Sequence, residues 1–226
     1  MSRKILLSWS SGKDSAWALH RLRQSGDWEI AGLLTTLNAA FDRVAMHSTR
    51  RALLEAQAQA AGLPLWPIPL PWPCSNLEYE AAMRKACDAA VAEGIEAVAF
   101  GDLFLEDIRR YREEKLSGTG LTPVFPVWGI DTRQLAEEMI ASGLRARIVC
   151  VDPKKLPREF AGREFDGEFL RDLPAGVDPC GENGEFHSAV YAGPMFREPI
   201  PIEGGEVVER DGFVFADVRL AEAVTV

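Results

Sequence analysis

The segment Ile5–Leu19, ILLSWSSGKDSAWAL, predicts a buried strand, a turn of small residues and the start of a helix. This order is typical of loops that bind phosphate, because small residues let backbone N–H groups approach an anion at the positively polarised start of a helix. Lys13 adds a positive charge, and serines in the same turn add hydroxyl donors. We therefore expect the turn to bind the phosphates of a nucleotide through Ser10, Ser11, Gly12, Lys13 and Ser15.

The loop differs from the Walker A motif, which needs glycine where Leu7 stands and serine or threonine where Asp14 stands. Asp14 would repel a phosphate unless a cation lay between the two groups. We therefore expect Asp14 to hold a Mg²⁺ ion that enters with the nucleotide. The alternative is that Asp14 and Ser15 only cap the helix, as both residue types commonly do.

The composition restricts the class of protein. The 226 residues suffice for one large domain, or for a domain with an appendage, and the net charge of −9 argues against broad binding of a nucleic-acid backbone. No apolar stretch approaches the ~18 residues of a membrane span, and the first apolar run is too short for a signal peptide. The four cysteines form no CxxC pair, which is typical of a reducing compartment and argues against a zinc ribbon or an iron–sulfur cluster. We therefore expect a cytoplasmic protein.

Strand-like and helix-like segments alternate through the first half of the chain. The predicted strands are Lys4–Trp9, Glu29–Thr35, Leu65–Leu70 and Glu96–Phe100, and the predicted helices are Asp14–Gln24, Ser48–Ala61 and Asn76–Glu93. Prolines place the third strand at an edge. Helices of this length between strands predict an α/β fold with a parallel, doubly wound sheet, in which ligands bind at the carboxyl ends of the strands.

The second half is less regular and predicts a smaller, mixed α+β region. Its predicted elements are the helices Asp102–Lys115 and Thr132–Ser142, the strands Leu144–Val151 and Ala189–Phe196, and a hairpin within Val207–Val218. The hairpin should turn at Arg210-Asp211-Gly212. Because the composition changes near Gly118–Pro126, we divide the chain into an ATP-binding domain, 1–120, and a substrate-binding region, 121–226.

Three ordered motifs resemble one superfamily of nucleotide-dependent enzymes. Ser10–Ser15 is similar to the SGGxDS signature of the PP-loop ATP pyrophosphatases, with Ser11 in place of the second glycine. Phe100–Glu113 (FGDLFLEDIRRYRE) and Pro179–Ser188 (PCGENGEFHS) resemble the diphthine–ammonia ligase branch of that superfamily. The resemblance spans roughly residues 4–196 and implies an adenine-nucleotide α-hydrolase (HUP-like) fold for the N-terminal part.

The resemblance implies an ATP-dependent amide ligase with Lys13 and Asp14 as catalytic residues. Such an enzyme adenylates a substrate carboxylate and releases pyrophosphate, and ammonia or an amine then displaces AMP. The substrate of the family is diphthine, a side chain of elongation factor two in archaea and eukaryotes. Arginine outnumbers lysine 19 to 6, as in GC-rich bacterial genomes, and Pro71–Glu80 lacks the acidic stretch of archaeal and eukaryotic members. A small carboxylate metabolite is therefore an alternative to a protein side chain.

Gly101 and Asp102 follow the predicted strand Glu96–Phe100, so we expect them at the sheet edge where the ligand binds. We expect Asp102 to hold Mg²⁺ or a substrate amine and to act in catalysis. The alternative is that it only caps the next helix. Arg109 and Arg112 lie one turn apart on that helix and could face the triphosphate or an acidic substrate; we assign both to the substrate. The alternative is that they pair with neighbouring glutamates on a solvated face.

The second strand ends at Thr35 and Thr36, where related folds bind adenine through backbone groups. His47 precedes the next helix and would flank the base or the activated carbonyl. We assign these three residues to the nucleotide. The stiff apolar segment Trp66–Pro73 either packs on the core or forms a wall of the substrate pocket.

The segment Cys180–His187, CGENGEFH, gathers reactive side chains on a turn that glycines make flexible. Carboxylates there would hold ammonium and accept its proton. With the resemblance as support, we expect Glu182 and Glu185 to be catalytic, and Asn183 and His187 to bind substrate. The alternative is an ordinary polar surface loop. We interpret Cys180 as structural.

Two other functions remain open. A PP-loop enzyme that modifies tRNA is one, although the acidic charge and the absent CxxC pair argue against it. The other is a sensor that binds ATP without releasing pyrophosphate. The expected ligands are ATP, Mg²⁺, a carboxylate substrate and ammonia or an amine. We expect neither membrane nor nucleic acid as a partner, and a homodimer is open.

Overall fold

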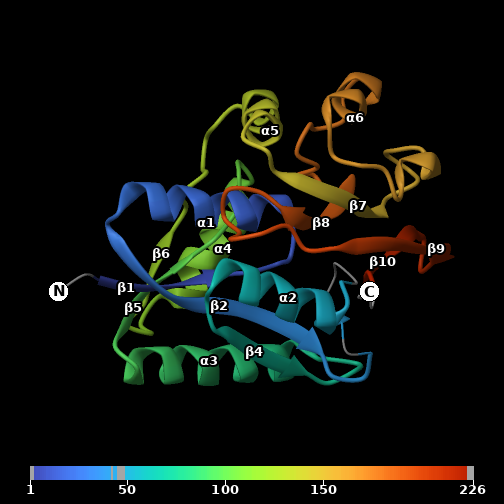
Figure 1. Cartoon of the computed structure of the whole chain (residues 1–226). Coiled ribbons are helices and arrows are strands. Elements are labelled where there is room, and N and C mark those ends of the chain that lie inside the picture. The colour runs from blue at the N-terminus through green and yellow to red at the C-terminus, as the bar shows by residue number, and fades with distance from the viewer. Residues whose placement is uncertain (1–2, 42, 45–48, 223–226) are drawn as a thin grey trace.

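The computed structural model describes residues 3–41, 43–44 and 49–222. The first half alternates strands and helices around one sheet (Figure 1). Its elements are β1 (Arg3–Ser8), α1 (Lys13–Ser25), β2 (Trp28–Asn38), β3 (Arg43–Val44), α2 (Arg51–Ala61), β4 (Leu65–Leu70), α3 (Asn76–Ala92), β5 (Ile95–Ala99), α4 (Glu106–Leu116) and β6 (Thr122–Val124).

The parallel strands follow the spatial order β4-β2-β1-β5-β6, and the short strand β3 pairs antiparallel with the end of β2. The order of the strands reverses between β1 and β5, which is therefore the switch point of a doubly wound sheet. These pairings confirm the predicted α/β fold with a parallel sheet. The proline-rich strand β4 lies at one edge, as expected.

Helices cover both faces of this sheet. Ile5 and Leu7 of β1 pack into a core that includes α1 and α2, whereas Leu6 packs into a second core with α3. The split follows from the period of two in a strand, which points successive side chains to opposite faces. Figure 1 shows α1 and α2 on one side of the sheet and α3 on the other.

The second half forms an antiparallel sheet with the order β8-β7-β10-β9, which confirms the mixed α+β region. Its elements are α5 (Thr132–Ala141), β7 (Arg145–Val151), the 3₁₀ helix η1 (Arg158–Phe160), α6 (Gly167–Asp172), β8 (Phe186–Ala192), β9 (Ile202–Arg210) and β10 (Phe213–Leu220). The predicted hairpin is present. Asp211 and Gly212 form its turn with φ values of 54° and 82°, which a two-residue turn between twisted strands favours.

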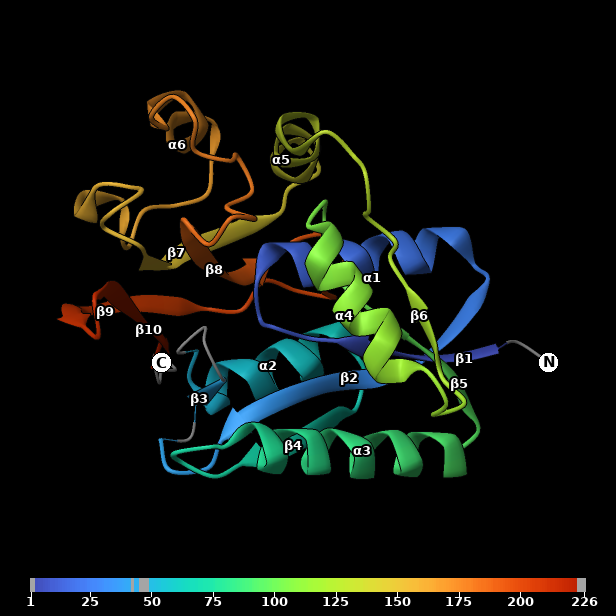
Figure 2. The same ribbon diagram turned by 180° about the vertical axis from the view of Figure 1, so that it is seen from behind.

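The two sheets lie against each other across α1. Helix α1 contacts β8, and side chains of both sheets belong to one hydrophobic core. The view from behind shows the second sheet and α5 beyond α1, on the side away from α3 (Figure 2). This packing brings the loop before β8 to the start of α1, although the two are far apart in the sequence.

Several element boundaries differ from the prediction. Strand β8 begins at Phe186 and not at Ala189, and β6 lies beyond the predicted domain boundary at residue 120 but joins the parallel sheet. Helix α4 begins at Glu106 and not at Asp102, because the preceding residues extend along the pocket described below. Helix α2 begins at Arg51, and its predicted start, Ser48, lies outside the described residues.

Among the described residues, no helix combines the length and the apolar character that crossing a membrane requires.

Candidate active site

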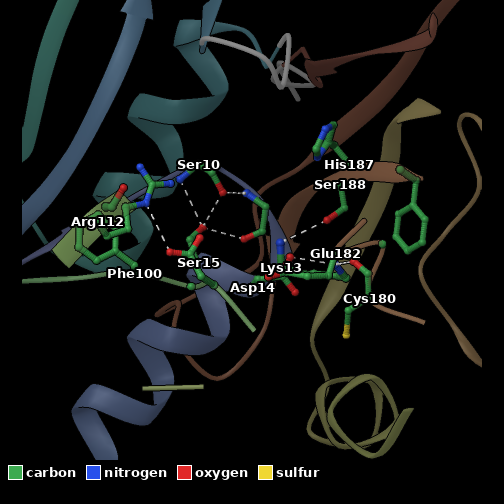
Figure 3. A pocket seen from close by; sticks show the side chains of 16 residues that line it. Ser10, Lys13, Asp14, Ser15, Phe100, Arg112, Cys180, Glu182, His187 and Ser188 are labelled. Atoms are coloured by element: carbon green, nitrogen blue, oxygen red, sulfur yellow. Dashed lines mark hydrogen bonds and ion pairs between the residues drawn. The ribbon is translucent and has the colours of Figure 1, made fainter. Parts of the chain in front are cut away.

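A pocket of about 220 Å³ opens at the switch point, between the carboxyl ends of β1 and β5. Its walls come from the predicted phosphate loop, from the residues after β5 and from the loop that leads into β8 (Figure 3). Of the predicted site residues, the pocket is lined by Ser10, Gly12, Lys13, Asp14, Ser15, Gly101, Asp102, Arg112, Glu182 and His187.

The phosphate loop is held in shape by its own hydroxyl groups. The Oγ atoms of Ser10 and Ser15 lie 3.2 Å apart, and Ser15 donates a 2.9 Å hydrogen bond to the carbonyl of Gly12. Gly12 occupies the N-cap position of α1, and a Cβ atom there would lie 3.2 Å from the carbonyl oxygen of Ser188. The loop therefore places the start of a 13-residue helix against the pocket, where the helix dipole favours an anion.

Ser11 has a left-handed backbone and a buried side chain. Its φ of 73° is in the left-handed region, which explains why the family signature has glycine there. The side chain is fully buried, and its hydroxyl donates a 2.5 Å hydrogen bond to Oε1 of Gln57. This hydroxyl therefore faces the interior and Ser11 does not line the pocket, so its binding to phosphate stays a prediction.

The buried side chain of Lys13 lines the pocket. Its side chain is only 2% exposed, and its ammonium group donates to Asp14 Oδ2 at 2.9 Å and to the carbonyl of Cys180. The rings of Phe165 and Phe186 lie 5.5 and 5.2 Å from the nitrogen. Burial is the largest single influence and lowers the pKa of Lys13, but Asp14, Cys180 and Glu182 together outweigh it and the pKa is raised, so the group is charged at neutral pH.

Asp14 carries an unsatisfied oxygen at the pocket. Its Oδ1 atom is buried and lacks a hydrogen-bond partner among the described residues, whereas Oδ2 accepts from Lys13. Burial raises the pKa of this carboxyl, and the Lys13 ammonium partly opposes the rise. An orphaned carboxylate oxygen fits a hard cation such as Mg²⁺. Within the described part of the chain, no three His, Cys, Asp or Glu side chains gather as a metal site.

The residues after β5 form the opposite wall. A Cβ atom on Gly101 would lie 2.9 Å from the backbone of Asp14, so only glycine allows the close approach of this strand end to α1. Asp102 does not cap α4, whose N-cap is Leu105, but pairs with Arg112 at 3.4 Å. The guanidinium of Arg112 also lies 4.9 Å from the ring of Phe100.

Arg109 does not line the pocket, and its assignment to the substrate stays a prediction. It pairs with Glu113 at 2.8 Å, and its guanidinium lies against the rings of Phe125 and Trp128. Arg112, three positions further along the same helix, is rotated by about 60° around the helix axis from Arg109 and lines the pocket. The alternative of a glutamate pair is thus confirmed for Arg109 alone.

The two predicted catalytic glutamates have different environments. Glu182 lines the pocket and accepts a 2.7 Å hydrogen bond from the backbone N–H of Leu103. Burial raises the pKa of Glu182 to about 7, although this hydrogen bond opposes the rise. Glu185 is buried beneath the loop, where Oε1 accepts from the Asp178 N–H and from the amide of Asn183, both at 3.1 Å. Glu185 and Asn183 therefore brace the loop and do not line the pocket, and the roles predicted for them stay predictions.

His187 lies across the phosphate loop from Arg112 (Figure 3). Burial, with a contribution from Lys13, lowers the pKa of His187 to about 4, so its imidazole is neutral at physiological pH. Cys180 lines the pocket, and its buried thiol donates to the carbonyl of Thr132 at 3.4 Å. A structural role for Cys180 stays a prediction.

The region predicted to bind adenine lies next to this pocket. Thr36 lines a second cavity of about 270 Å³, which shares Ser8, Ser10, Phe100 and Arg112 with the first. Thr35 is buried and donates a 2.9 Å hydrogen bond to the carbonyl of Trp9, so its side chain supports the loop. His47 lies outside the described residues.

Sequence reasoning missed residues that support the site from a distance. Ser188 accepts a 3.2 Å hydrogen bond from the backbone N–H of Lys13, and its place in the motif PCGENGEFHS was the available signal. Nothing in the sequence marked Gln57, in the middle of α2, as a residue that supports the site. Its Oε1 accepts from Trp9 and Ser11, while its Nε2 donates to the carbonyls of Ser11 and Val190.

Comparison with known proteins gives matches along nearly the whole chain. The sequence model of the diphthamide synthase N-terminal domain matches residues 3–122, and that of the C-terminal domain matches residues 131–222. The diphthine–ammonia ligases of Bos taurus and Danio rerio are each 27% identical to this chain over 92% of its length, covering 86% and 90% of those proteins. The human diphthine–ammonia ligase is 31% identical over 56% of this chain and 49% of its own length.

The matched regions contain the phosphate loop, the residues after β5 and the loop before β8, which meet at one pocket. The resemblance expected from the three motifs is confirmed. The chain belongs to the diphthamide synthase family.

Proposed function

We propose that this chain is an ATP-dependent ligase that joins ammonia or an amine to a substrate carboxylate, with AMP and pyrophosphate as the other products. One observation carries the proposal: a pyrophosphatase-like loop and the carboxyl of Glu182 open into the same pocket. The names of the relatives support it, since they are diphthine–ammonia ligases.

The triphosphate would bind at the start of α1. The backbone of the Ser10–Ser15 loop, the helix dipole and the charge of Lys13 all favour an anion there. The adenosine would lie in the adjoining cavity beside Thr36. In this arrangement the pyrophosphate leaves toward the loop, where preorganised donors stabilise its developing charge.

Asp14 would hold Mg²⁺ through its orphaned Oδ1 atom. When bound, the ion neutralises charge on the phosphate oxygens. The remaining positions around the ion would be filled by the nucleotide and water, since Mg²⁺ usually binds through one or two carboxylates together with substrate phosphates.

The reaction has two steps. In the first, an oxygen of the substrate carboxylate attacks the α-phosphorus, the bond between the α- and β-phosphates breaks, and pyrophosphate leaves. In the second, the amine nitrogen attacks the acyl carbon, the C–O bond to AMP breaks, and AMP leaves with the oxygen that came from the carboxylate. Glu182 holds the ammonium form of the nucleophile and accepts its proton, a role that its raised pKa suits.

The test is to incubate the protein with ATP, Mg²⁺, ammonium and a panel of carboxylic acids, and to measure pyrophosphate. At least one acid should increase the release of pyrophosphate and AMP in equal amounts, and Glu182→Gln should reduce amide formation. A protein that binds ATP and releases no pyrophosphate with any acid would be a nucleotide sensor. Release that depends on added tRNA instead would favour a tRNA-modifying enzyme.

A further inference from the structure

The pocket at the switch point and the adjoining cavity of about 270 Å³ meet at a shared wall. We call these two spaces the phosphate pocket and the adenosine cavity, after the parts of ATP that the proposed function places in them. Four residues line both spaces: Ser8, Ser10, Phe100 and Arg112. The α-phosphate joins the adenosine to the rest of the triphosphate. A nucleotide that spans both spaces should therefore place its α-phosphate beside these four residues.

Arg112 supplies the positive charge at this junction. It is the charged member of the shared wall, and in the described part of the chain the adenosine cavity has no other charged residue in its lining. Lys13, the other cation of the phosphate pocket, lies on the opposite side of Ser10 and Ser15 (Figure 3). The two cations are thus placed for different phosphates of one nucleotide.

Three contacts hold the guanidinium of Arg112 at the junction. Its Nε donates to Oδ2 of Asp102 at 3.4 Å, and its carbon lies 4.9 Å from the centroid of the Phe100 ring. Burial raises the pKa of Tyr79 and Arg112 opposes the rise, so the guanidinium also lies near that hydroxyl.

These contacts leave Arg112 able to bind an anion. The ion pair with Asp102 is long and engages Nε, whereas a guanidinium has further N–H donors on its two terminal nitrogens. The side chain is 31% exposed, so the ion pair does not enclose it. A guanidinium that is already held in place loses little conformational freedom when it binds a phosphate.

The adenylation step needs a cation at the α-phosphate. A carboxylate oxygen forms a bond to the α-phosphorus, the bond from this phosphorus to the bridging oxygen of the β-phosphate breaks, and the electron pair leaves with pyrophosphate. Both reacting groups are anions, so they repel each other unless a positive group lies beside them. Fixed donors also stabilise the charge on the phosphate oxygens in the transition state. Arginine suits this task because its planar donors fit a phosphate and it stays charged.

We propose that Arg112 is a catalytic residue that contacts the α-phosphate of ATP and offsets its charge while the acceptor carboxylate attacks. This inference rests on the proposed function, and it assigns Arg112 to the nucleotide and not to the acceptor. Lys13 and the start of α1 remain with the β- and γ-phosphates.

The binding test compares AMP with adenosine, because the two differ only in the α-phosphate. Each is titrated calorimetrically into the whole protein. Arg112→Gln should weaken AMP binding by about tenfold or more, as the loss of a charge-assisted hydrogen bond does, and should leave adenosine binding within about twofold. Arg112→Lys keeps the charge but loses the planar donors, so it should recover part of the loss.

The matched control is Arg110→Gln, which removes the same charge from an exposed position of α4 that lines neither space. It should leave the affinity for both ligands unchanged. Three results would overturn the inference. They are an unchanged AMP affinity in Arg112→Gln, equal losses for AMP and adenosine in that variant, and an equal loss of AMP binding in Arg110→Gln.

A second measurement needs no variant to fold. The unaltered protein is crystallised with α,β-methylene-ATP, which cannot release pyrophosphate. A terminal nitrogen of Arg112 should lie within about 3.2 Å of an oxygen of the α-phosphate. A bound nucleotide whose α-phosphate lacks this contact would contradict the inference.

A kinetic arm separates this inference from the proposed function. With an acid that promotes pyrophosphate release, Arg112→Gln should reduce kcat on the order of a hundredfold and change the KM for the acid much less, and Arg112→Lys should restore part of kcat. If AMP binding depends on Arg112 but no acid releases pyrophosphate, the assignment of Arg112 stands and the proposed function fails. If Arg112→Gln releases pyrophosphate at the unaltered rate, the function stands and the inference is wrong.

Discussion

Burial gives Glu182 a property that an exposed carboxyl group lacks. Its side chain lines the pocket, and loss of water raises its pKa to about 7 despite the hydrogen bond from Leu103. A group with a pKa near neutrality can both hold and release a proton at the working pH, as a general base must. In this pocket it lies among the residues that would bind ATP.

The pH dependence of the reaction should follow the protonation of the Glu182 carboxyl group. Below about pH 7 the group is protonated and cannot accept a proton, so kcat/KM for ammonia should fall up to about tenfold per pH unit. Glu182→Gln should abolish this acid limb and reduce kcat/KM on the order of a hundredfold at higher pH. The measurement is a profile of kcat/KM against pH for both proteins.

Glu185→Gln is the matched control, because that side chain lies in the same loop but outside the pocket and can still accept its hydrogen bonds. It should retain the acid limb. An acid limb that persists in Glu182→Gln would show that another group titrates and that Glu182 is not the base.

The same pair of residues shows the limit of sequence reasoning about the site. Glu182 and Glu185 are the same residue type in one glycine-rich loop, and only the fold turns one toward the pocket and the other beneath the loop. Likewise, Arg109 and Arg112 share a helix, but one faces Phe125 and the other Phe100. Motifs located the site, whereas the direction of each side chain depended on packing between distant segments.

Among the structural elements, Gln57 connects α2, the phosphate loop and β8. This side chain on α2 is fully buried, and its amide bonds to the phosphate loop and to Val190 of β8. Ser11 has a left-handed backbone, which costs a residue other than glycine about 1–3 kcal/mol. The Gln57 amide offsets that cost and fixes the shape of the loop.

Gln57→Leu should therefore affect both stability and nucleotide binding. It leaves the buried donors of Trp9 and Ser11 without partners, so the free energy of unfolding should fall by about 2–4 kcal/mol and ATP affinity should decrease. Urea denaturation and calorimetric titration measure the two effects. Gln59→Leu, at an exposed position of the same helix, should change neither. If Gln57→Leu matched Gln59→Leu in both assays, the amide would have no supporting role.

Sequence periodicity predicted most elements of the fold, since buried strands such as β1 and amphipathic helices have strong patterns. It missed the three-residue strand β6, the two-residue strand β3 and the six-residue helix α6, which are too short for a period to appear. It also began α4 too early, because residues 102–105 have helical composition but extend to meet Arg112 and Glu182.

At the scale of the whole molecule, the two halves complete one site. The first half supplies the phosphate loop and the strand end after β5, and the second supplies the loop before β8. The backbone joins them, since the N–H of Val190 donates a 3.0 Å hydrogen bond to the carbonyl of Ser11. We propose that the division near residue 120 separates nucleotide binding from acceptor binding.

The proposed adenylation of a carboxylate can be tested directly by following an oxygen atom. An acid that supports pyrophosphate release is labelled with ¹⁸O in its carboxyl group and converted with ATP and ammonia, and the products are analysed by mass spectrometry. If a carboxylate oxygen attacks the α-phosphorus and leaves with AMP, as we propose, one ¹⁸O atom should appear in AMP and none in pyrophosphate. Unlabelled AMP, or ADP with label in inorganic phosphate, would contradict it.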